Sequence, residues 1–429
     1  MRIRLRGARV IDPGSIDDYL DVVMEDGLIS ALLEPGTPPD ESNPFDIDCS
    51  GMIVVPGLID IHVHLREPGH EYKETIRTGL LAAARGGFTA VCAMPNTLPV
   101  NDGIEMTAFM VSRARELGGS RLYPVGAITR GLKGETLCEY AGMKRAGIVA
   151  LSDDGRPVER AGVMRRAMEY ARGIGLPVIS HAEDISLAGD GSMNEGVVAT
   201  RLGLKGIPNA AESTIVMRDI ALAELTGASL HIAHVSCRES VDAIRRAKKR
   251  GVPVTAETAP HYFTLTHEDV ARYDTHAKMN PPLRTEQDRM AIIDALGDGT
   301  LDIIATDHAP HSSLEKDVEF DRAAFGIVGL ETSLGLSLQL VRDGVMDMAA
   351  LIKAMSKNPA KLLGIDNDLK PGNPADLTVI DPEAFWTVDS KLFASKGRNT
   401  PFQGYNLKGE VFMTIVQGRI AHGIPDGQG

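Results

Sequence analysis

The central part of the chain alternates short apolar runs with longer segments whose apolar residues recur at helical spacing. A strand followed by a helix, repeated eight times, is typical of a closed parallel barrel. An open, doubly wound sheet is the alternative, but no G-x-G-x-x-G follows the first run, and polar residues end too many runs for one switch point. We therefore predict an α/β fold, a (β/α)8 TIM barrel, with strands at 58–64, 89–94, 122–128, 148–152, 177–181, 229–234, 252–258 and 301–307 and helices at 72–85, 105–117, 161–173, 212–226, 239–250 and 286–296.

Both ends of the chain have a β-like pattern without helical periodicity. Strand candidates lie at 3–11, 20–24, 28–33 and 52–55 near the start, and at 375–381 and 411–416 near the end. Because chain termini often lie close together, these strands could pair into one sheet. We expect a small β domain built from both chain ends, 1–55 and 365–429, beside a catalytic barrel at 56–364.

Polar residues of metal-ligand type follow most of the predicted strands. In a barrel of this kind the active site lies at the carboxyl ends of the strands, so these side chains should converge. Taken singly, a histidine or aspartate at a strand end is more often a cap or a core hydrogen-bonding group. Together they exceed the needs of one tetrahedral zinc and suit two metals about 3.5 Å apart. The strand-end residues are His62, His64, Asn96, Asp153, Asp154, His181, His234, Asp307, His308 and His311.

The spacing of residues along the chain does not settle the role of several of these side chains. Asp153 and Asp154 are adjacent, so their side chains should point opposite ways, and spacing does not decide between them. His231 lies three residues before His234 and is expected to face the helices, with a structural role. Arg66 shares the side of His64 if the strand continues, and with Asn96 and His311 it would suit a carboxylate. The competing interpretation of Arg66 is a surface salt bridge with Glu67.

Composition narrows the class of partner and compartment. A net charge of -13 argues against nucleic acid or an anionic membrane as the main partner. The four cysteines, Cys49, Cys92, Cys138 and Cys237, lie far apart, so neither a disulfide framework nor a thiolate zinc site is expected. No apolar stretch resembles a signal peptide or a membrane span, and we expect a cytoplasmic protein.

The motifs resemble those of the amidohydrolase superfamily and, within it, the class I bacterial dihydroorotases, along nearly the whole chain. A His-x-His pair marks only the superfamily, whereas the residues that extend it at 65–69, together with the motifs at 280–284 and 307–311, are more specific. The resemblance rests on His62-Val63-His64-Leu65-Arg66-Glu67-Pro68-Gly69, Met94-Pro95-Asn96-Thr97, Ser152-Asp153-Asp154-Gly155, Ser180-His181-Ala182-Glu183, His234-Val235-Ser236, Asn280-Pro281-Pro282-Leu283-Arg284 and Thr306-Asp307-His308-Ala309-Pro310-His311.

The resemblance implies zinc-dependent, reversible cyclisation of N-carbamoyl-L-aspartate to L-dihydroorotate in pyrimidine biosynthesis. It implies zinc, two ions per subunit, with Asp307 as the catalytic proton acceptor and Asp154 as the bridging ligand. In many relatives a carboxylated lysine bridges the metals, but here the fourth strand ends in aspartates. The implied metal ligands are His62, His64, Asp154, His181, His234 and Asp307, and the implied substrate contacts are His64, Arg66, Asn96, Asn280, His311, Phe325 and Gly326.

Other functions remain as alternatives. Another cyclic amidase, such as a hydantoinase, dihydropyrimidinase or allantoinase, would act on substrates without the same ring carboxylate, so Arg66, Asn96 and His311 discriminate. An inactive homologue that scaffolds aspartate transcarbamoylase would be expected to have lost ligands, and none of the implied ligands is missing. Aspartate transcarbamoylase and a second copy of the chain are candidate partners, and the charged loop at 312–324 is a candidate lid over the site.

Overall fold

A parallel barrel forms the larger part of the molecule. The computed structural model describes residues 2–36, 38, 45–270 and 272–423. Eight strands pair in the order β15-β14-β13-β10-β9-β8-β7-β6, and an isolated parallel bridge between Val63 and His308 joins the two ends of this sheet. The TIM-barrel prediction is confirmed, with every strand near its predicted place: β6 (Leu58–Val63), β7 (Phe88–Ala93), β8 (Arg121–Gly126), β9 (Ala150–Leu151), β10 (Val178–Ser180), β13 (Leu230–Ile232), β14 (Val254–Thr258) and β15 (Ile303–Ile304).

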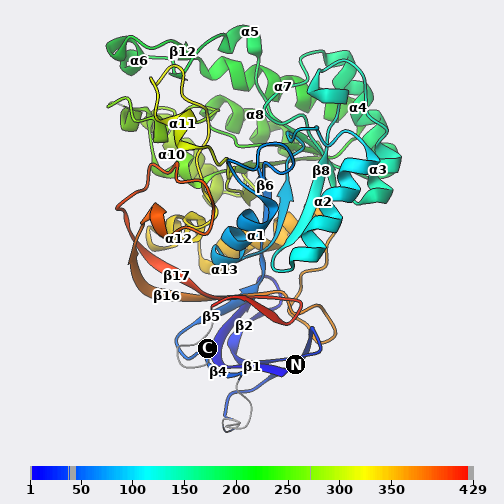
Figure 1. Cartoon of the computed structure of the whole chain (residues 1–429), viewed down its shortest axis with the longest axis vertical. Coiled ribbons are helices and arrows are strands. Elements are labelled where there is room, and N and C mark those ends of the chain that lie inside the picture. Colours follow the sequence, from blue (N-terminus) through cyan, green and yellow to red (C-terminus); the bar gives the residue numbers. More distant parts are fainter. Residues whose placement is uncertain (1, 37, 39–44, 271, 424–429) are drawn as a thin grey trace.

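Helices surround the barrel and bury one face each against it (Figure 1). In α4, for example, Val163, Met164, Ala167, Met168 and Ala171 are buried at helical spacing, and burying a side chain such as Val or Met contributes about 1.5–3 kcal/mol. The principal helices are α1 (Ile76–Arg85), α2 (Ile104–Leu117), α3 (Tyr140–Ala146), α4 (Ala161–Ile174), α7 (Asn209–Thr226), α8 (Arg238–Lys249), α10 (Glu286–Gly297), α12 (Ser333–Arg342), α13 (Met348–Ile352) and α14 (Asn358–Leu363).

Short elements that sequence patterns did not predict occupy the connections. Most of them follow a barrel strand, where the chain must reverse before the next helix. None of the helices in the described ranges is long and apolar enough to cross a membrane. The short elements are α5 (Ile185–Ala188), β11 (Met193–Asn194), α6 (Val197–Leu202), β12 (Gly206–Ile207), α9 (Pro260–Thr264) and α11 (Ser313–Lys316).

The two chain ends build a second, mixed sheet below the barrel (Figure 1). Its strands pair in the order β18-β17-β16-β5-β1-β2-β3, with β4 beside β1. Val54 of β5 pairs with Val379 of β16, so the N-terminal and C-terminal strands form one sheet as predicted. The domain boundaries themselves stay a prediction. The strands are β1 (Arg2–Asp12), β2 (Ile16–Glu25), β3 (Leu28–Leu33), β4 (Asp46–Asp48), β5 (Ile53–Pro56), β16 (Leu377–Thr387), β17 (Asn406–Val416) and β18 (Arg419–His422).

Candidate functional site

The strand-end side chains meet around one cavity of about 230 Å³ at the carboxyl end of the barrel. His62, which is fully buried, lies beneath it and contacts two of its lining residues. The cavity brings together residues from positions 64 to 326, including every other residue that the sequence motifs proposed for metal or substrate. Its lining is His64, Arg66, Asn96, Asp154, Gly155, His181, His234, Asn280, Asp307, Ala309, His311, Phe325 and Gly326.

Asp154 lies between two pairs of histidines. Its carboxylate oxygens are 3.3 Å from His62 Nε2 and 3.4 Å from His64 Nε2 on one side. On the other side they are 3.4 Å from His181 Nδ1 and 3.6 Å from His234 Nε2. The result is two buried groups of potential ligands that share Asp154.

This donor set fits bound metal ions. At zinc–ligand distances of 2.0–2.1 Å, neighbouring ligand atoms of a tetrahedral site lie about 3.3 Å apart, close to the separations around Asp154. His62 Nε2 and Asp154 Oδ1 are buried and have no hydrogen-bond partner among the described residues. Unpaired buried polar atoms are costly, and a cation between them would satisfy both.

The electrostatics of the cluster also favour a cation. Burial opposes ionisation of Asp154, but His62, His181 and His234 hold the pKa of this carboxyl well below its usual value. Burial likewise opposes ionisation of Asp307, and His62 and His64 lower its pKa. Asp307 Oδ1 lies 3.2 Å from His64 Nε2 and 3.6 Å from His62 Nε2, at the side of the first histidine pair. These shifts favour the ionised form of both carboxylates, which face imidazole nitrogens.

Asp153 serves a different purpose from Asp154. Its side chain accepts hydrogen bonds from the backbone N–H groups of Ile128 and Thr129 and from the Thr129 hydroxyl. These bonds hold the loop after β8 and turn Asp153 away from the histidines. The structure thus separates two aspartates that spacing left equivalent.

A buried carboxylate behind the site, Glu257, was missed by the sequence patterns. Its Oε1 lies 2.6 Å from His62 Nδ1, and its Oε2 lies 3.2 Å from His231 Nε2. Burial opposes its ionisation, but His62 and His231 keep its pKa at about 2. A carboxylate on the far nitrogen of a metal-binding histidine fixes the tautomer and aims the other nitrogen at the metal. The available signal was a glutamate inside the apolar run 252–258.

The expected orientation of His231 is wrong. Alternation predicted that it faces the helices, but it shares Glu257 with His62 and therefore lies inside the barrel. Leu230 and Ile232 instead belong to the outer core. His234, which follows the end of β13, has a φ of 33°. This left-handed residue breaks the alternation, so His231 and His234 both point inward.

Two further site residues share this backbone strain. Arg66 has a φ of 61° and Asp307 a φ of 48°, in the region that non-glycine residues rarely adopt. Each such residue costs on the order of 1–3 kcal/mol, and they persist where the surroundings hold them. β6 ends at Val63, so the condition under which Arg66 would share the side of His64, a strand that continues to Arg66, is not met.

Arg66 is placed by the segment around His311. Its Nε donates to the Pro310 carbonyl at 3.2 Å, and its Nη2 lies 3.4 Å from His311 Nε2 without a hydrogen bond, because that nitrogen donates to the Phe325 carbonyl. Glu67 instead accepts from the Ile76 backbone N–H and pairs with Arg113, which excludes the surface salt bridge considered for Arg66. Arg66 therefore keeps most of its donors free to face the cavity.

His311 is a neutral ring in this arrangement. Burial and the nearby Arg66 guanidinium lower its pKa to about 3. Its Nε2 lies 2.8 Å from the Phe325 carbonyl, so that nitrogen carries the proton and donates. The same bond brings Phe325 and Gly326 to the cavity wall.

Asn96 and Asn280 complete the wall. The Asn96 side-chain oxygen accepts from His64 Nδ1 at 2.9 Å, which leaves its amide group available to the cavity. Asn280 donates to Glu183 Oε1 at 3.0 Å, and the other oxygen of Glu183 lies 3.4 Å from His181 Nε2. Glu183 belongs to the motif at 180–183 but was given no role there, and it repeats at His181 the role that Glu257 has at His62.

Comparisons with known proteins agree with this arrangement. Residues 51–240 match a family model described as dihydro-orotase-like. A dihydroorotase from Desulforapulum autotrophicum is 66% identical over 98% of this chain and 99% of its own length, and one from Geobacter metallireducens is 56% identical over 98% and 100%. Among solved structures, an L-hydantoinase (dihydropyrimidinase) from Arthrobacter aurescens superposes with a TM-score of 0.85 and 25% identity, over 97% of this chain and 95% of that one.

Proposed function

Because this chain belongs to the dihydroorotase family, as its motifs predicted, we propose that its cavity catalyses reversible closure of N-carbamoyl-L-aspartate to L-dihydroorotate. The chain is a cyclic amide hydrolase, and the hydantoinase-like alternatives are not favoured. The observation that carries the specific reaction is the composition of the cavity. Two ligand groups that share Asp154 adjoin Arg66, which is the one arginine or lysine among the described residues that line it.

Arg66 supplies the selectivity for an acidic ring. A guanidinium presents paired N–H donors that match a carboxylate, and half-burial strengthens that contact relative to water. The amides of Asn96 and Asn280 and the Phe325–Gly326 backbone would hold the remaining ring atoms. Neutral His311 adds no second charge, so Arg66 alone would balance the carboxylate.

The metal ligands in this proposal are His62, His64, Asp154, His181, His234 and Asp307, and they would hold two zinc ions. Zinc bound there would polarise the ring carbonyl and lower the pKa of water. In hydrolysis a C–O bond forms and the ring C–N bond breaks, while Asp307 accepts the proton of the attacking water and delivers it to the leaving ring nitrogen. In ring closure the C–N bond forms and a carboxyl C–O bond breaks, while Asp307 takes the proton from the ureido nitrogen and returns it to the departing oxygen, which leaves as water.

The other expectations remain predictions that this proposal includes. They are the domain boundaries, a cytoplasmic location, self-association and a complex with aspartate transcarbamoylase. The inactive-scaffold reading is the second candidate, but the complete ligand set supports an active enzyme.

A matched pair of substrates tests the proposal. Dihydrouracil is dihydroorotate without the ring carboxylate, so we expect the zinc-loaded chain to prefer dihydroorotate by about a thousandfold in kcat/KM or more. Arg66→Gln should remove most of this preference by raising the KM for dihydroorotate, with a smaller change in kcat. Preferential turnover of dihydrouracil, hydantoin or allantoin would contradict the assignment. A folded, zinc-loaded chain with no turnover would instead support the scaffold.

A further inference from the structure

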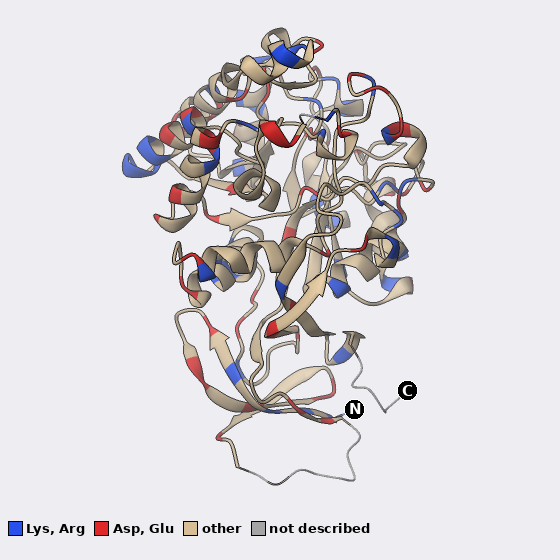
Figure 2. Ribbon diagram, turned by 90° about the vertical axis from the view of Figure 1, so that its left-hand side faces the viewer, with Lys and Arg blue, Asp and Glu red and all other residues tan. Residues whose placement is uncertain are grey.

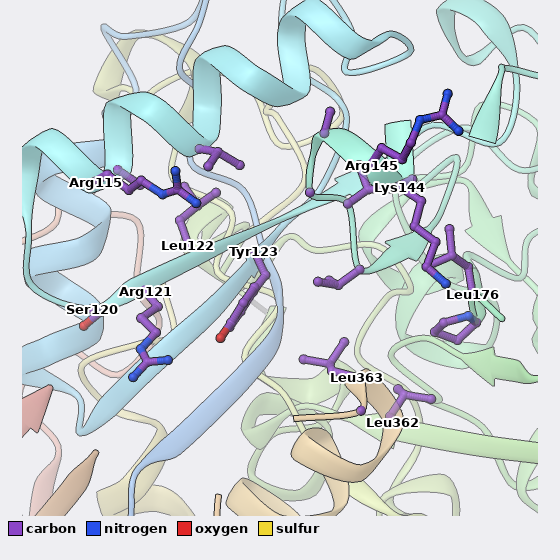
Figure 3. Close-up of a pocket in the computed structure, with 18 of the residues that line it drawn as sticks. Arg115, Ser120, Arg121, Leu122, Tyr123, Lys144, Arg145, Leu176, Leu362 and Leu363 are labelled. Atoms are coloured by element: carbon purple, nitrogen blue, oxygen red, sulfur yellow. The ribbon is translucent and has the colours of Figure 1, made fainter. Parts of the chain in front are cut away.

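A second and larger cavity lies at the opposite end of the barrel from the active site. Its volume is about 840 Å³, and it opens among the amino-terminal ends of β8, β9 and β10 and the carboxyl-terminal ends of α2, α3 and α14. Figure 3 shows this cavity between Arg115, Arg121 and Lys144. The residues of the proposed active site line a different cavity, so this space has no assigned role.

The lining of this cavity is cationic in an acidic chain. Five of its residues are arginine or lysine and none is aspartate or glutamate, although the whole chain has a net charge of -13. Elsewhere acidic and basic residues are interspersed along the ribbon (Figure 2). Arg121 is paired with Asp376 at 2.5 Å. Arg115, Arg145 and Lys361 have no carboxylate or carbonyl partner among the described residues.

The carboxyl-terminal ends of helices offset part of this positive charge. Arg115, Lys144 and Lys361 each lie in the last turn of a helix, where the backbone carbonyls carry partial negative charge. Lys144 also donates to the Ile174 carbonyl. A helix end offsets only about half a unit charge, however, so a positive potential remains in the cavity.

The floor of the cavity is apolar. Leu122, Ile148 and Leu176 are buried there, and Leu362 and Leu363 of α14 close it from below in the view of Figure 3. Tyr123 lies beside Arg121 and presents a ring to the same space. An apolar floor with a few convergent polar groups is the usual form of a small-molecule site, and 840 Å³ lies within the usual range of such sites.

We propose that this cavity binds a small aromatic phosphate monoester, of the chemical class that includes nucleoside monophosphates. The phosphate, with close to two negative charges, would pair with the Arg115 guanidinium, and Lys144 would add positive potential from the other side of the cavity. The aromatic body would pack on Tyr123 and the leucines. Arg145 points away from this space and contributes less.

Isothermal titration of the zinc-loaded full chain with 1-naphthyl phosphate tests this inference. We expect binding that the double variant Arg115→Gln, Lys144→Gln weakens by about tenfold or more. Lys133→Gln, an exposed lysine outside the cavity, serves as the matched control and should bind like the parent chain. The double variant should hydrolyse dihydroorotate at the parent rate, which also shows that it folds.

Three comparisons decide where and how the ligand binds. Inorganic phosphate should bind more weakly than 1-naphthyl phosphate, and equal affinity would overturn the role of the apolar floor. Equal affinity for uncharged 1-naphthol would overturn the role of the cations. Loss of binding in Arg66→Gln but not in the double variant would place the ligand in the active site, and no binding of 1-naphthyl phosphate at all would also overturn the inference.

Discussion

Asp154 is the residue on which both histidine pairs depend. It is buried among four imidazoles, and its neighbour Asp153 is occupied by backbone hydrogen bonds. A carboxylate with two oxygens can contact both pairs at once, which a single histidine nitrogen cannot do. Asp307 is different, because it approaches only the first pair and also lines the cavity where a substrate would lie.

Asp307→Asn should lower kcat by about a thousandfold or more, because an amide cannot accept and return the proton. Steady-state hydrolysis of dihydroorotate, together with the zinc content of the purified variant, checks this. Asp317→Asn, an exposed aspartate of the nearby loop, is the matched control and should retain the parent rate. A rate for Asp307→Asn near that of the parent chain would remove its assigned role.

Glu257→Gln should weaken zinc binding by about tenfold to a hundredfold, because it frees the ring of His62 to turn and to change tautomer. A competition titration with a chromophoric chelator measures this affinity without reference to activity. Circular dichroism of the metal-free variant shows whether it folds. Unchanged affinity in a folded variant would mean that His62 is held by other contacts.

At the scale of elements, the loop after His311 is held down by two buried lysines. Lys316 of α11 donates to the carbonyls of Lys278 and Ala324, and Lys278 donates to those of Phe320 and Asp321. Each lysine is only 2% exposed. We call these two lysines and the carbonyls that they bind the lysine clamp. Gly326 also donates to the Lys278 carbonyl, so the lysine clamp fixes the backbone of the cavity wall.

The clamp predicts a pH-dependent loop. Burial, followed by the nearby charge of Lys278, lowers the pKa of Lys316 to about 7 from an ordinary 10.5, and burial lowers that of Lys278 to about 8. Between about pH 7 and pH 10.5, the closed loop therefore binds fewer protons at Lys316 than the open loop does. Loop closure should become more favourable as the pH rises above about 7, and this gain should be absent below it.

Lys316→Met should open the loop about tenfold more often, since two buried carbonyls lose their donor. Chymotrypsin cleavage beside Leu314, which is 84% exposed, measures the opening. The ratio of variant to parent cleavage rates should rise between pH 7 and pH 9, because only the parent loop closes more tightly as Lys316 loses its proton. Taking this ratio cancels the pH dependence of the protease itself. A ratio that stays constant with pH would contradict the titration of Lys316, and Lys133→Met should leave cleavage unchanged.

At the scale of the whole molecule, the site is built from residues at the ends of most of the barrel strands. The proposed ligands lie in β6 or shortly after β6, β9, β10, β13 and β15, so a metal bound by the folded chain would stabilise the closed barrel as a unit. The terminal sheet adds a second connection, because β5 enters the barrel directly through β6 and pairs with β16.

Metal removal should lower the melting temperature by several degrees, because a ligand present at a thousandfold its Kd contributes about 4 kcal/mol to stability. Differential scanning calorimetry before and after dialysis against dipicolinate measures the change, and added zinc should reverse it. Asp154→Asn, which lacks the shared carboxylate, should respond much less to the chelator. An equal response in both chains would show that zinc stabilises them somewhere else.

The barrel, its strand positions and the convergence of strand-end residues were predictable from the sequence because they depend on local periodicity and on one rule of barrel geometry. The tertiary structure decided what local patterns do not contain. Glu257 and His62 are 195 positions apart, and the lysine clamp joins Lys278 to a loop 38 or more positions away. Strict alternation failed at His234 because its backbone is left-handed, and such strain is held by distant packing rather than by the neighbouring residues.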